Sequence, residues 1–404
     1  MTVIKESKWI SKITQKDNIE IILFIMSLSV AFSSEIGNLN INNKITHSIL
    51  LIWIIRAGFK FKKNGYCIKN KGLSNLLYTF IKYNFYPKVI IYIYTIVLII
   101  FRLTEKRFLS TNIQTFVNAI SAIAIICLYE KKAFEYSMKA LFLSYIYAVF
   151  GSIWLYGIEF IKYLEFHDMA FGTGYVIIYF FMTNKKLSKK DLKYVIFSLI
   201  LVLLAYKRIE LGALALVYLF YLILKKFTVE QRKIIIKITG TLFIIVCFAY
   251  IYVIFNGVIW EWFNMLGIEV SGRNYYYQAV VDISEFSPFF WGYGRNSMAT
   301  IFTNELSFMN VGNLHSDILR MYAECGFILF GLWLWVYLYR MPSVVEEKFG
   351  YNSMECLFIC TLYTFIVYFT DNTELYLINQ YFYMLIPIYY ILTSKSENDE
   401  VKFN

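Results

Sequence analysis

Long apolar stretches alternate with short polar segments along the whole chain. A helix needs about 20 mostly apolar residues to cross the hydrocarbon core of a bilayer. Twelve stretches approach that length: residues 19–35, 45–58, 87–104, 111–129, 137–157, 170–184, 192–206, 210–224, 238–256, 318–339, 353–370 and 376–393. The pattern predicts an all-α, polytopic integral membrane protein with about twelve transmembrane helices, in which residues 1–404 form a single membrane domain.

The composition excludes most soluble classes of protein. Hydrophobic residues make up 59% of the 404 residues and aromatic residues 20%, and the mean hydropathy is +0.54. Charged residues make up 17%, compared with about 25% in soluble domains. Such a chain has too little polar surface to cover itself in water, which excludes a cytosolic enzyme and a disordered chain. The six cysteines form no CxxC pair and fall mostly in apolar stretches, which indicates packing and no disulfide or zinc framework.

The net charge of +11 is explained by membrane topology, without nucleic acid as a partner. With the N-terminus placed inside and the stretches alternating, 29 of the 39 Lys and Arg residues fall in inside segments. This bias is typical of cytoplasmic loops and predicts that both termini are cytoplasmic. Four lysines precede the first apolar stretch, and no small-residue cleavage pattern follows it, so we expect a retained anchor.

Two segments between the apolar stretches stand out. Residues 257–317 form a large extracytoplasmic loop between predicted spans 9 and 10, and function is expected to concentrate there. Most of its Trp and Tyr residues are interpreted as a belt at the lipid headgroups, and a minority as platforms for sugar rings. Residues 70–86, on the inside, are interpreted as a basic amphipathic helix on the inner leaflet.

Several motifs are absent from the sequence. It has no GxxxxGK[ST] phosphate loop, no HExxH and no DxD, and its three histidines are too few for a histidine-built metal cage. Nucleotide-driven transport is therefore unsupported. The first external loop, residues 36–44, lacks the acidic pair that many membrane glycosyltransferases use. GTG at 172–174 and GYG at 292–294 are interpreted as turns or sites of close helix packing.

Three strings follow one another from the large loop into predicted span 10: SGRNYYYQAV (271–280), SPFFWGYGRN (287–296) and NLHSDILRMYAECGFILFG (313–331). In their order, side of the membrane and spacing they resemble the family of O-antigen ligases and Wzy-like oligosaccharide repeat-unit polymerases. That family has a loop SGR segment, a P..G.G turn and an HN..L....E.G block. The resemblance covers about sixty residues.

The family's motif positions can be assigned residue by residue. Arg273 takes the place of the loop arginine, His315 that of the motif histidine, and Glu324 with Gly326 the end of the block. An earlier family arginine, at the outer mouth of a mid-chain span, matches Arg208 in AYKRIELGALAL. The sequence departs from the ligases at Ser316, where they usually have Asn, and at the Tyr that replaces the common Trp after the loop arginine. These departures favour the polymerases, whose pattern is looser.

The resemblance implies a GT-C-like glycan polymerase/ligase architecture and a metal-independent membrane glycosyltransferase. The growing glycan is expected to pass from undecaprenyl diphosphate to a newly arrived lipid-linked repeat unit outside the bacterial cytoplasmic (inner) membrane. His315 would activate the acceptor hydroxyl, while Arg273 and Arg208 would hold the diphosphates. The implied partners are the lipid-linked oligosaccharide, membrane lipid, and a chain-length regulator and flippase of the same pathway; no cofactor is implied.

The residue types fit this chemistry. Forming a glycosidic bond from a lipid diphosphate requires a base for the acceptor hydroxyl and fixed cations for the leaving group. Arginine offers a rigid fork to phosphate oxygens, and a histidine near two arginines should have a lowered pKa and stay neutral. Arg295 is assigned to phosphate binding, and His167, with Asp168, is the reserve candidate for the base. Arg320 and Glu324, four residues apart, are expected to form a structural ion pair in which Glu324 also orients a catalytic cation.

Two alternative functions stay open. One is a ligase that moves finished glycan onto another lipid or a protein, and the other is a flippase or transporter of the lipid-linked oligosaccharide. A flippase is expected to carry charges in mid-span cavities and to show inverted halves, whereas the distinctive charges here cluster at the outer mouth. The abundance of Ile, Lys, Asn, Tyr and Phe suits an AT-rich bacterial genome and favours capsule or exopolysaccharide over O-antigen.

Overall fold

The protein is helical throughout the part of the chain that the computed structural model describes, with no strand in that part. The described residues are 2–34, 36, 43–63, 71–100, 109–159, 167–183, 188–265, 273–295, 297, 298 and 314–398. The helices are α1 Thr2–Ser33, α2 Asn43–Lys63, α3 Lys71–Ile100, α4 Leu109–Tyr129, α5 Ala133–Tyr156, α6 His167–Met182, α7 Lys189–Ala205, α8 Arg208–Leu224, α9 Val229–Phe255, α10 Val258–Met265, α11 Arg273–Ile283, α13 Asp317–Trp335, α14 Met341–Phe349, α15 Tyr351–Val367 and α16 Leu377–Asn398. A short turn of helix at Glu130–Lys132 (η2) links α4 to α5, and a π-helical turn at Val336–Arg340 (η5) links α13 to α14.

Each of the twelve predicted apolar stretches falls on one of these helices, but their membrane-spanning character is only partly confirmed. Within the described residues, three helical stretches are long and apolar enough to cross a membrane: Thr115–Trp154, Val229–Phe255 and Asp317–Phe349. Asn18–Ser33, Asp168–Met182 and Tyr351–Val367 are shorter apolar helices. The protein is therefore an integral membrane protein, whereas the count of twelve spans stays a prediction.

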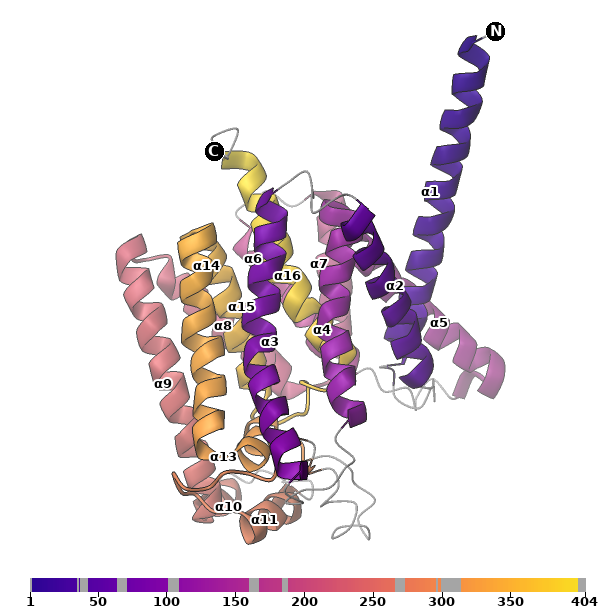
Figure 1. The fold of residues 1–404 in the computed structure, drawn as a ribbon. Helices are drawn as coiled ribbons and strands as arrows, with labels where there is room; N and C mark the ends of the chain where they lie inside the picture. The colour runs from indigo at the N-terminus through magenta and orange to yellow at the C-terminus, as the bar shows by residue number, and fades with distance from the viewer. Residues whose placement is uncertain are drawn as a thin grey trace.

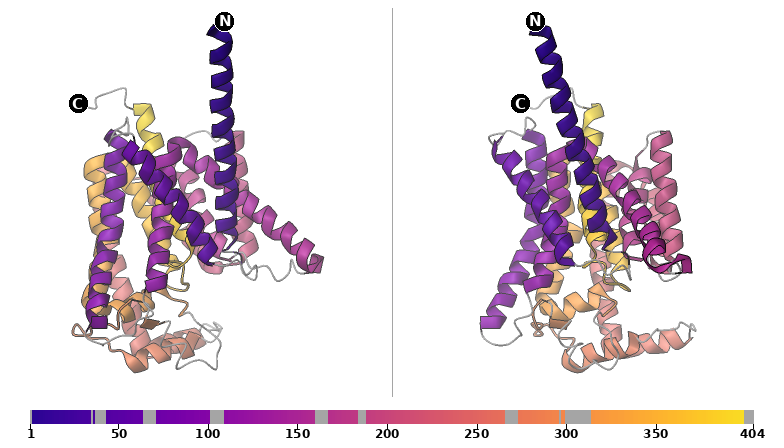
Figure 2. Two further views of the ribbon diagram at one scale, coloured as in Figure 1. Left: turned by 45° about the vertical axis from the view of Figure 1, so that its right-hand side comes forward. Right: turned by 90° about the vertical axis from the view of Figure 1, so that its right-hand side faces the viewer.

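The helices form a bundle whose two ends differ (Figure 1). The start of α1 and the end of α16 lie at the upper end in that view, where α1 extends beyond the other helices (Figure 2). Helices α10 and α11 lie across the lower end, next to the beginning of α13. The described residues between α9 and α13 thus lie at the opposite end of the bundle from the start of α1 and the end of α16, as the alternating topology predicts.

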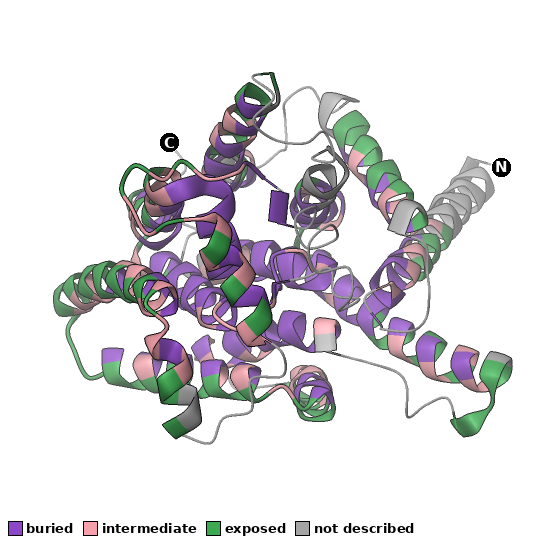
Figure 3. Ribbon diagram, turned by 90° about the horizontal axis from the view of Figure 1, so that it is seen from below, coloured by how far each residue is buried: buried purple, intermediate pink, exposed green. Residues whose placement is uncertain are grey.

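Residues of α6, α13, α15 and α16 are mostly buried. Seen from below, the buried residues gather at the centre of the bundle and the exposed ones around it (Figure 3). Almost every residue of α15 is buried, as is most of α16. By contrast, only 22% of the apolar window of α9 is buried inside the structure, and residues such as Ile245 and Val246 are exposed. A helix whose outward residues are apolar suits a lipid surrounding, so α9 is peripheral and α15 and α16 are central.

Residues 71–86 do not form the separate inner-leaflet helix that the sequence suggested. They are the first half of α3, which continues through Pro87 to Ile100. Leu76 and Phe80 are buried there, and Lys348 Nζ of α14 donates to Thr79 Oγ1 at 3.1 Å. The apolar face that looked suited to lipid packs against protein instead, which is why the expectation was wrong.

The GTG sequence is a site of close helix packing, as expected. A Cβ added at Gly172 would lie 2.1 Å from Ile378 Cγ2, and one at Gly174 would lie 2.2 Å from the Tyr363 hydroxyl. The two glycines let α6 approach α16 and α15 closely. This packing holds α6, α15 and α16 together.

Candidate functional site

The first turn of α13 presents the motif histidine. Ser316 caps this helix, because its Oγ accepts a hydrogen bond from Leu319 N at 3.2 Å. His315, directly before the cap, has a φ of +52°, an uncommon value for a residue with a side chain. Its ring lies 6.4 Å from that of Tyr276 on α11, measured between centroids, and its side chain is partly exposed. The structure therefore places His315 next to α11, at the end of the bundle that α11 covers.

Two glycines of the resemblance motif contact each other. α13 is kinked at Gly326, where φ is +74°, and a Cβ there would lie 2.2 Å from the backbone of Trp291. Across this contact Tyr293 N donates to Ala323 O, Gly294 N to Glu324 O and Phe327 N to Phe290 O. Non-helical backbone inside a membrane bundle needs such partners. The P..G.G turn and the E.G block are thus one structural unit that brings Arg295 into the bundle.

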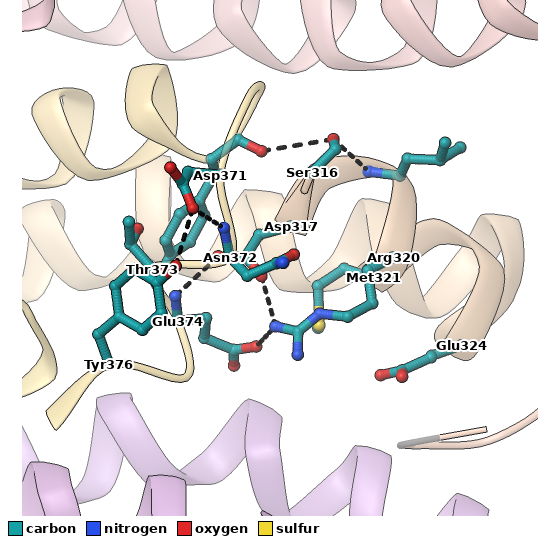
Figure 4. A network of polar contacts seen from close by, with 12 residues as sticks. Ser316, Asp317, Arg320, Met321, Glu324, Asp371, Asn372, Thr373, Glu374 and Tyr376 are labelled. Carbon is teal, nitrogen blue, oxygen red and sulfur yellow. Dashed lines mark hydrogen bonds and ion pairs between the residues drawn. The ribbon is translucent and has the colours of Figure 1, made fainter. Parts of the chain in front are cut away.

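The loop between α15 and α16 completes the site, and the sequence analysis did not single it out. Asp371 and Glu374 of this loop are buried, and both are tied to Asp317 at the start of α13 (Figure 4). Asp317 N donates to Asp371 O at 3.2 Å, and Glu374 N donates to Asp317 Oδ2 at 2.7 Å. The loop is consequently fixed directly beside His315.

Charged side chains from three further elements meet at this position. Lys207, just before α8, makes an ion pair of 3.0 Å with Asp371 Oδ2. Arg273, the first residue of α11, donates from Nη2 to Thr370 O at 3.4 Å. Both cations, together with Asp371, act electrostatically on His315. We call His315, Arg273, Lys207 and Asp371 the outer site.

The pKa values in the outer site favour a neutral histidine beside an ionised aspartate. Burial lowers the pKa of His315, and the lowering effect of Arg273 and Lys207 adds to it, against the raising effect of Asp371. Burial alone would raise the pKa of Asp371, but Lys207 and the hydrogen bonds from Asn372 N and the Tyr376 hydroxyl lower it below its usual value. At neutral pH the imidazole of His315 is therefore able to accept a proton.

A second group of charged side chains is buried beside the first turns of α13, and Figure 4 shows four of its members, Asp317, Arg320, Glu324 and Glu374. Arg295 pairs with Glu324 Oε2 at 2.9 Å and with Glu374 Oε2 at 2.5 Å. Arg320 pairs with Asp317 Oδ1 and with the same Glu374 oxygen, both at 2.5 Å. All five side chains are at most 7% exposed. We call Arg295, Arg320, Asp317, Glu324 and Glu374 the buried cluster.

The buried cluster contradicts one predicted ion pair and shows that Arg295 is bound by carboxylates. The predicted ion pair between Arg320 and Glu324 is wrong, because Asp317 and Glu374 take Arg320 while Arg295 takes Glu324. Arg295, assigned to phosphate binding from the sequence, has both Nη atoms on carboxylates. Burial alone would raise the pKa of Glu374, but Arg295, Arg320 and Lys88 lower it to about 2. Glu374 is therefore ionised and holds the cluster together.

The remaining candidates lie at the edge of the described site. Arg208, the first residue of α8, is exposed and makes no hydrogen bond or ion pair with another described residue. The neighbouring Lys207 is the basic residue that reaches Asp371. α6 begins at His167, but the side chain of His167 lies outside the described residues. No group of three or more His, Cys, Asp or Glu residues in the described part of the chain is arranged to hold a metal ion.

These features define a class of protein: an all-helical integral membrane protein with a histidine among fixed cations at one end of its bundle. Residues 194–334, from α7 to α13, match the family model described as O-antigen ligase. The match confirms the resemblance that the loop motifs suggested, and such proteins are membrane ligases and polymerases of glycans. No curated protein matches the sequence. Asp371 and Glu374 lie beyond the matched residues.

Proposed function

We propose that the protein polymerises lipid-linked oligosaccharide repeat units of a capsule, an exopolysaccharide or an O-antigen. The observation that carries this proposal is the pairing of a histidine of lowered pKa with the cations Arg273 and Lys207 in the outer site. A glycosyl transfer from a diphosphate needs one proton acceptor and fixed positive charge, and both are present together. The family match supports the reaction class, and the sequence departures from the ligases favour the polymerase.

In the proposed reaction the imidazole of His315 takes the proton from an acceptor hydroxyl on the incoming repeat unit. The freed oxygen electron pair forms the new bond to the anomeric carbon of the growing glycan. The bond from that carbon to the undecaprenyl diphosphate oxygen breaks, and its electron pair leaves with the diphosphate. Arg273 is assigned to this developing negative charge because it is partly exposed and, within the described part of the chain, its hydrogen-bond partner is the carbonyl oxygen of Thr370.

The other candidates take roles that follow from their positions. Arg208, exposed at the start of α8, is assigned to the second diphosphate. Asp371 orients the site by holding Lys207 and facing His315. Arg295 and Glu324 hold the loop and α13 in place from within the bundle and do not touch substrate. His167 stays the reserve base.

The proposal includes a location. The end of the bundle that carries α10, α11 and the outer site faces the extracytoplasmic side of a bacterial cytoplasmic membrane, and both termini face the cytoplasm. The substrate is an undecaprenyl-diphosphate-linked oligosaccharide delivered by the flippase of the same pathway. A chain-length regulator is the expected protein partner, and the scheme requires no metal or nucleotide.

The experiment measures the lengthening of glycans in liposomes that contain the purified protein, with lipid-linked repeat units inserted on the accessible side. The wild-type protein should produce a ladder of longer products, and His315→Ala should lower the rate by about 10²–10⁴-fold. His47→Ala, on α2, is the matched control and should keep the ladder. A full ladder from His315→Ala would remove the base assignment. Units that cross the bilayer unchanged would indicate a flippase, and transfer only to a different acceptor would indicate a ligase.

A further inference from the structure

A small cavity lies inside the bundle next to the buried cluster. It is lined by Lys88 of α3, Glu374 of the α15–α16 loop and Gln380 of α16, together with aromatic side chains that include Tyr337, Tyr368 and Tyr383. The lining combines opposite charges with an amide, so the cavity is polar. None of the motifs of the sequence analysis includes Lys88 or Gln380.

Lys88 is the unexplained charge at this site. It is 6% exposed and lies near the middle of α3, yet no hydrogen bond or ion pair joins it to another described residue. A buried ammonium group without partners is costly, and charged side chains within a membrane bundle usually serve a function. Its electrostatic neighbours are Glu374, which attracts it, and Arg295 and Arg320, which repel it.

Glu374 offers the partner that Lys88 lacks. Its Oε2 accepts from both Arg295 and Arg320, while Oε1 accepts no hydrogen bond from a described residue. Gln380 Nε2 donates to the Tyr368 hydroxyl at 3.2 Å, and its second N–H has no acceptor among the described residues. A buried water needs two to four polar partners. The Lys88 ammonium, the free Glu374 oxygen and the second Gln380 N–H provide a donor, an acceptor and a donor around one cavity.

We propose that Lys88 is a positioning residue for the outer site, acting through a water molecule that it shares with Glu374 in this cavity. Glu374 N holds Asp317, Asp317 N holds Asp371 O, and Asp371 acts electrostatically on His315. Fixing the second oxygen of Glu374 therefore fixes the loop on which the environment of His315 depends. The catalytic consequence rests on the proposed function, whereas the coupling of Lys88 to His315 does not.

The test compares Lys88→Met and Lys88→Gln with Lys82→Met, a matched control on the exposed side of the same helix. Lys88→Met removes the water's donor and should lower kcat/KM about tenfold or more, because small displacements of a catalytic group are costly. Lys88→Gln keeps a donor and should lower kcat/KM less. Lys82→Met should match the wild-type protein.

A second readout is independent of transfer. The chain has only three histidines, so ring-labelled His315 can be followed by NMR in a His47→Gln, His167→Gln background. Asp371 raises the pKa of His315, so a loop that moves Asp371 away should shift the titration midpoint to lower pH in Lys88→Met and less in Lys88→Gln. If Lys88→Met does not fold, Lys88→Gln decides by the same shift.

The outcomes separate the two proposals. An unchanged midpoint in the Lys88 variants overturns the positioning role, even if less folded protein is recovered. If the titration midpoint shifts in the Lys88 variants but the wild-type protein does not lengthen glycans, the positioning role of Lys88 stands and the proposed polymerase function is overturned.

Discussion

The outer site and the buried cluster both combine cationic and acidic side chains near the beginning of α13, yet their charges are paired very differently. In the buried cluster Glu374 joins two arginines, and each arginine has a second carboxylate. Among the described residues of the outer site, Lys207 pairs with the Asp371 carboxylate, while Arg273 donates to a carbonyl oxygen.

This difference in pairing separates charges that stabilise the fold from charges that remain able to bind a ligand. A fully paired buried charge gains nothing from a substrate, and removing its partner leaves an uncompensated charge in a low-dielectric interior. A partly exposed arginine that is held by one carbonyl keeps most of its donors for a ligand. The buried cluster therefore fixes the backbone around His315, and the outer site keeps cations that a diphosphate can use.

The strongest test of this difference is to replace an arginine by methionine in each of the two regions. Arg320→Met should lower the free energy of unfolding by about 3–5 kcal/mol, because it leaves Asp317 and Glu374 without their cation. Arg273→Met should lower it by less than about 1 kcal/mol and should instead reduce kcat/KM. Denaturation of both variants in detergent, together with transfer rates, checks the pair. Equal stability losses would show that the two regions do not differ as proposed.

The contact between Gly292 and Gly326 predicts the next largest effect. Gly326→Ala would place a Cβ 2.2 Å from the Trp291 backbone at a φ of +74°, so we expect a loss of about 2–4 kcal/mol. Gly331→Ala, five residues further along α13, meets only the Phe248 ring at 3.4 Å and serves as the control. Thermal unfolding of the two variants provides the measurement. Equal melting temperatures would mean that the backbone around Trp291 can move away from α13 at little cost in free energy.

The positions of the helices followed from the sequence, whereas the loop that ties the site together did not. Long apolar stretches predict helices reliably because few other structures satisfy their backbone within a bilayer. The same reasoning treated residues 370–376 as a short connector between two stretches. Two buried carboxylates, Asp371 and Glu374, in so short a segment were the available signal.

The site residues divide in the same way. His315 and Arg273 were found through a motif, and they are near enough to each other for Arg273 to lower the pKa of His315; their roles stay predictions. The ion pair of Arg320 and Glu324 was inferred from helical spacing alone. Spacing makes such a pair possible, but Glu374 and Arg295 come from distant parts of the chain and offer stronger, buried partners. No local pattern contains that information.

The pH dependence of transfer sharpens the description of the outer site. Because the pKa of His315 is lowered, the neutral base should persist below pH 6.5, the ordinary value, and the rate should fall only in more acidic solution. Arg273→Gln removes a lowering effect and should move this acidic limb of kcat/KM to higher pH. Asp371→Asn removes a raising effect and should move it to lower pH. Shifts of the same sign in both variants would contradict the assignment of the limb to His315.

The smallest predicted effect concerns how Arg295 is held: by its ion pairs alone, or also by a hydrogen bond of its backbone N–H. Thr95 Oγ1 of α3 accepts a hydrogen bond from Arg295 N at 2.9 Å, so Thr95→Val leaves a buried N–H without a partner in nearly the same volume. We expect a loss of about 1 kcal/mol in the free energy of unfolding and no shift of the acidic limb. Thr241→Val, at an exposed threonine of α9, is the control and should cost less. A loss as large as that of Arg320→Met would mean that the backbone contact, rather than the buried cluster, anchors Arg295.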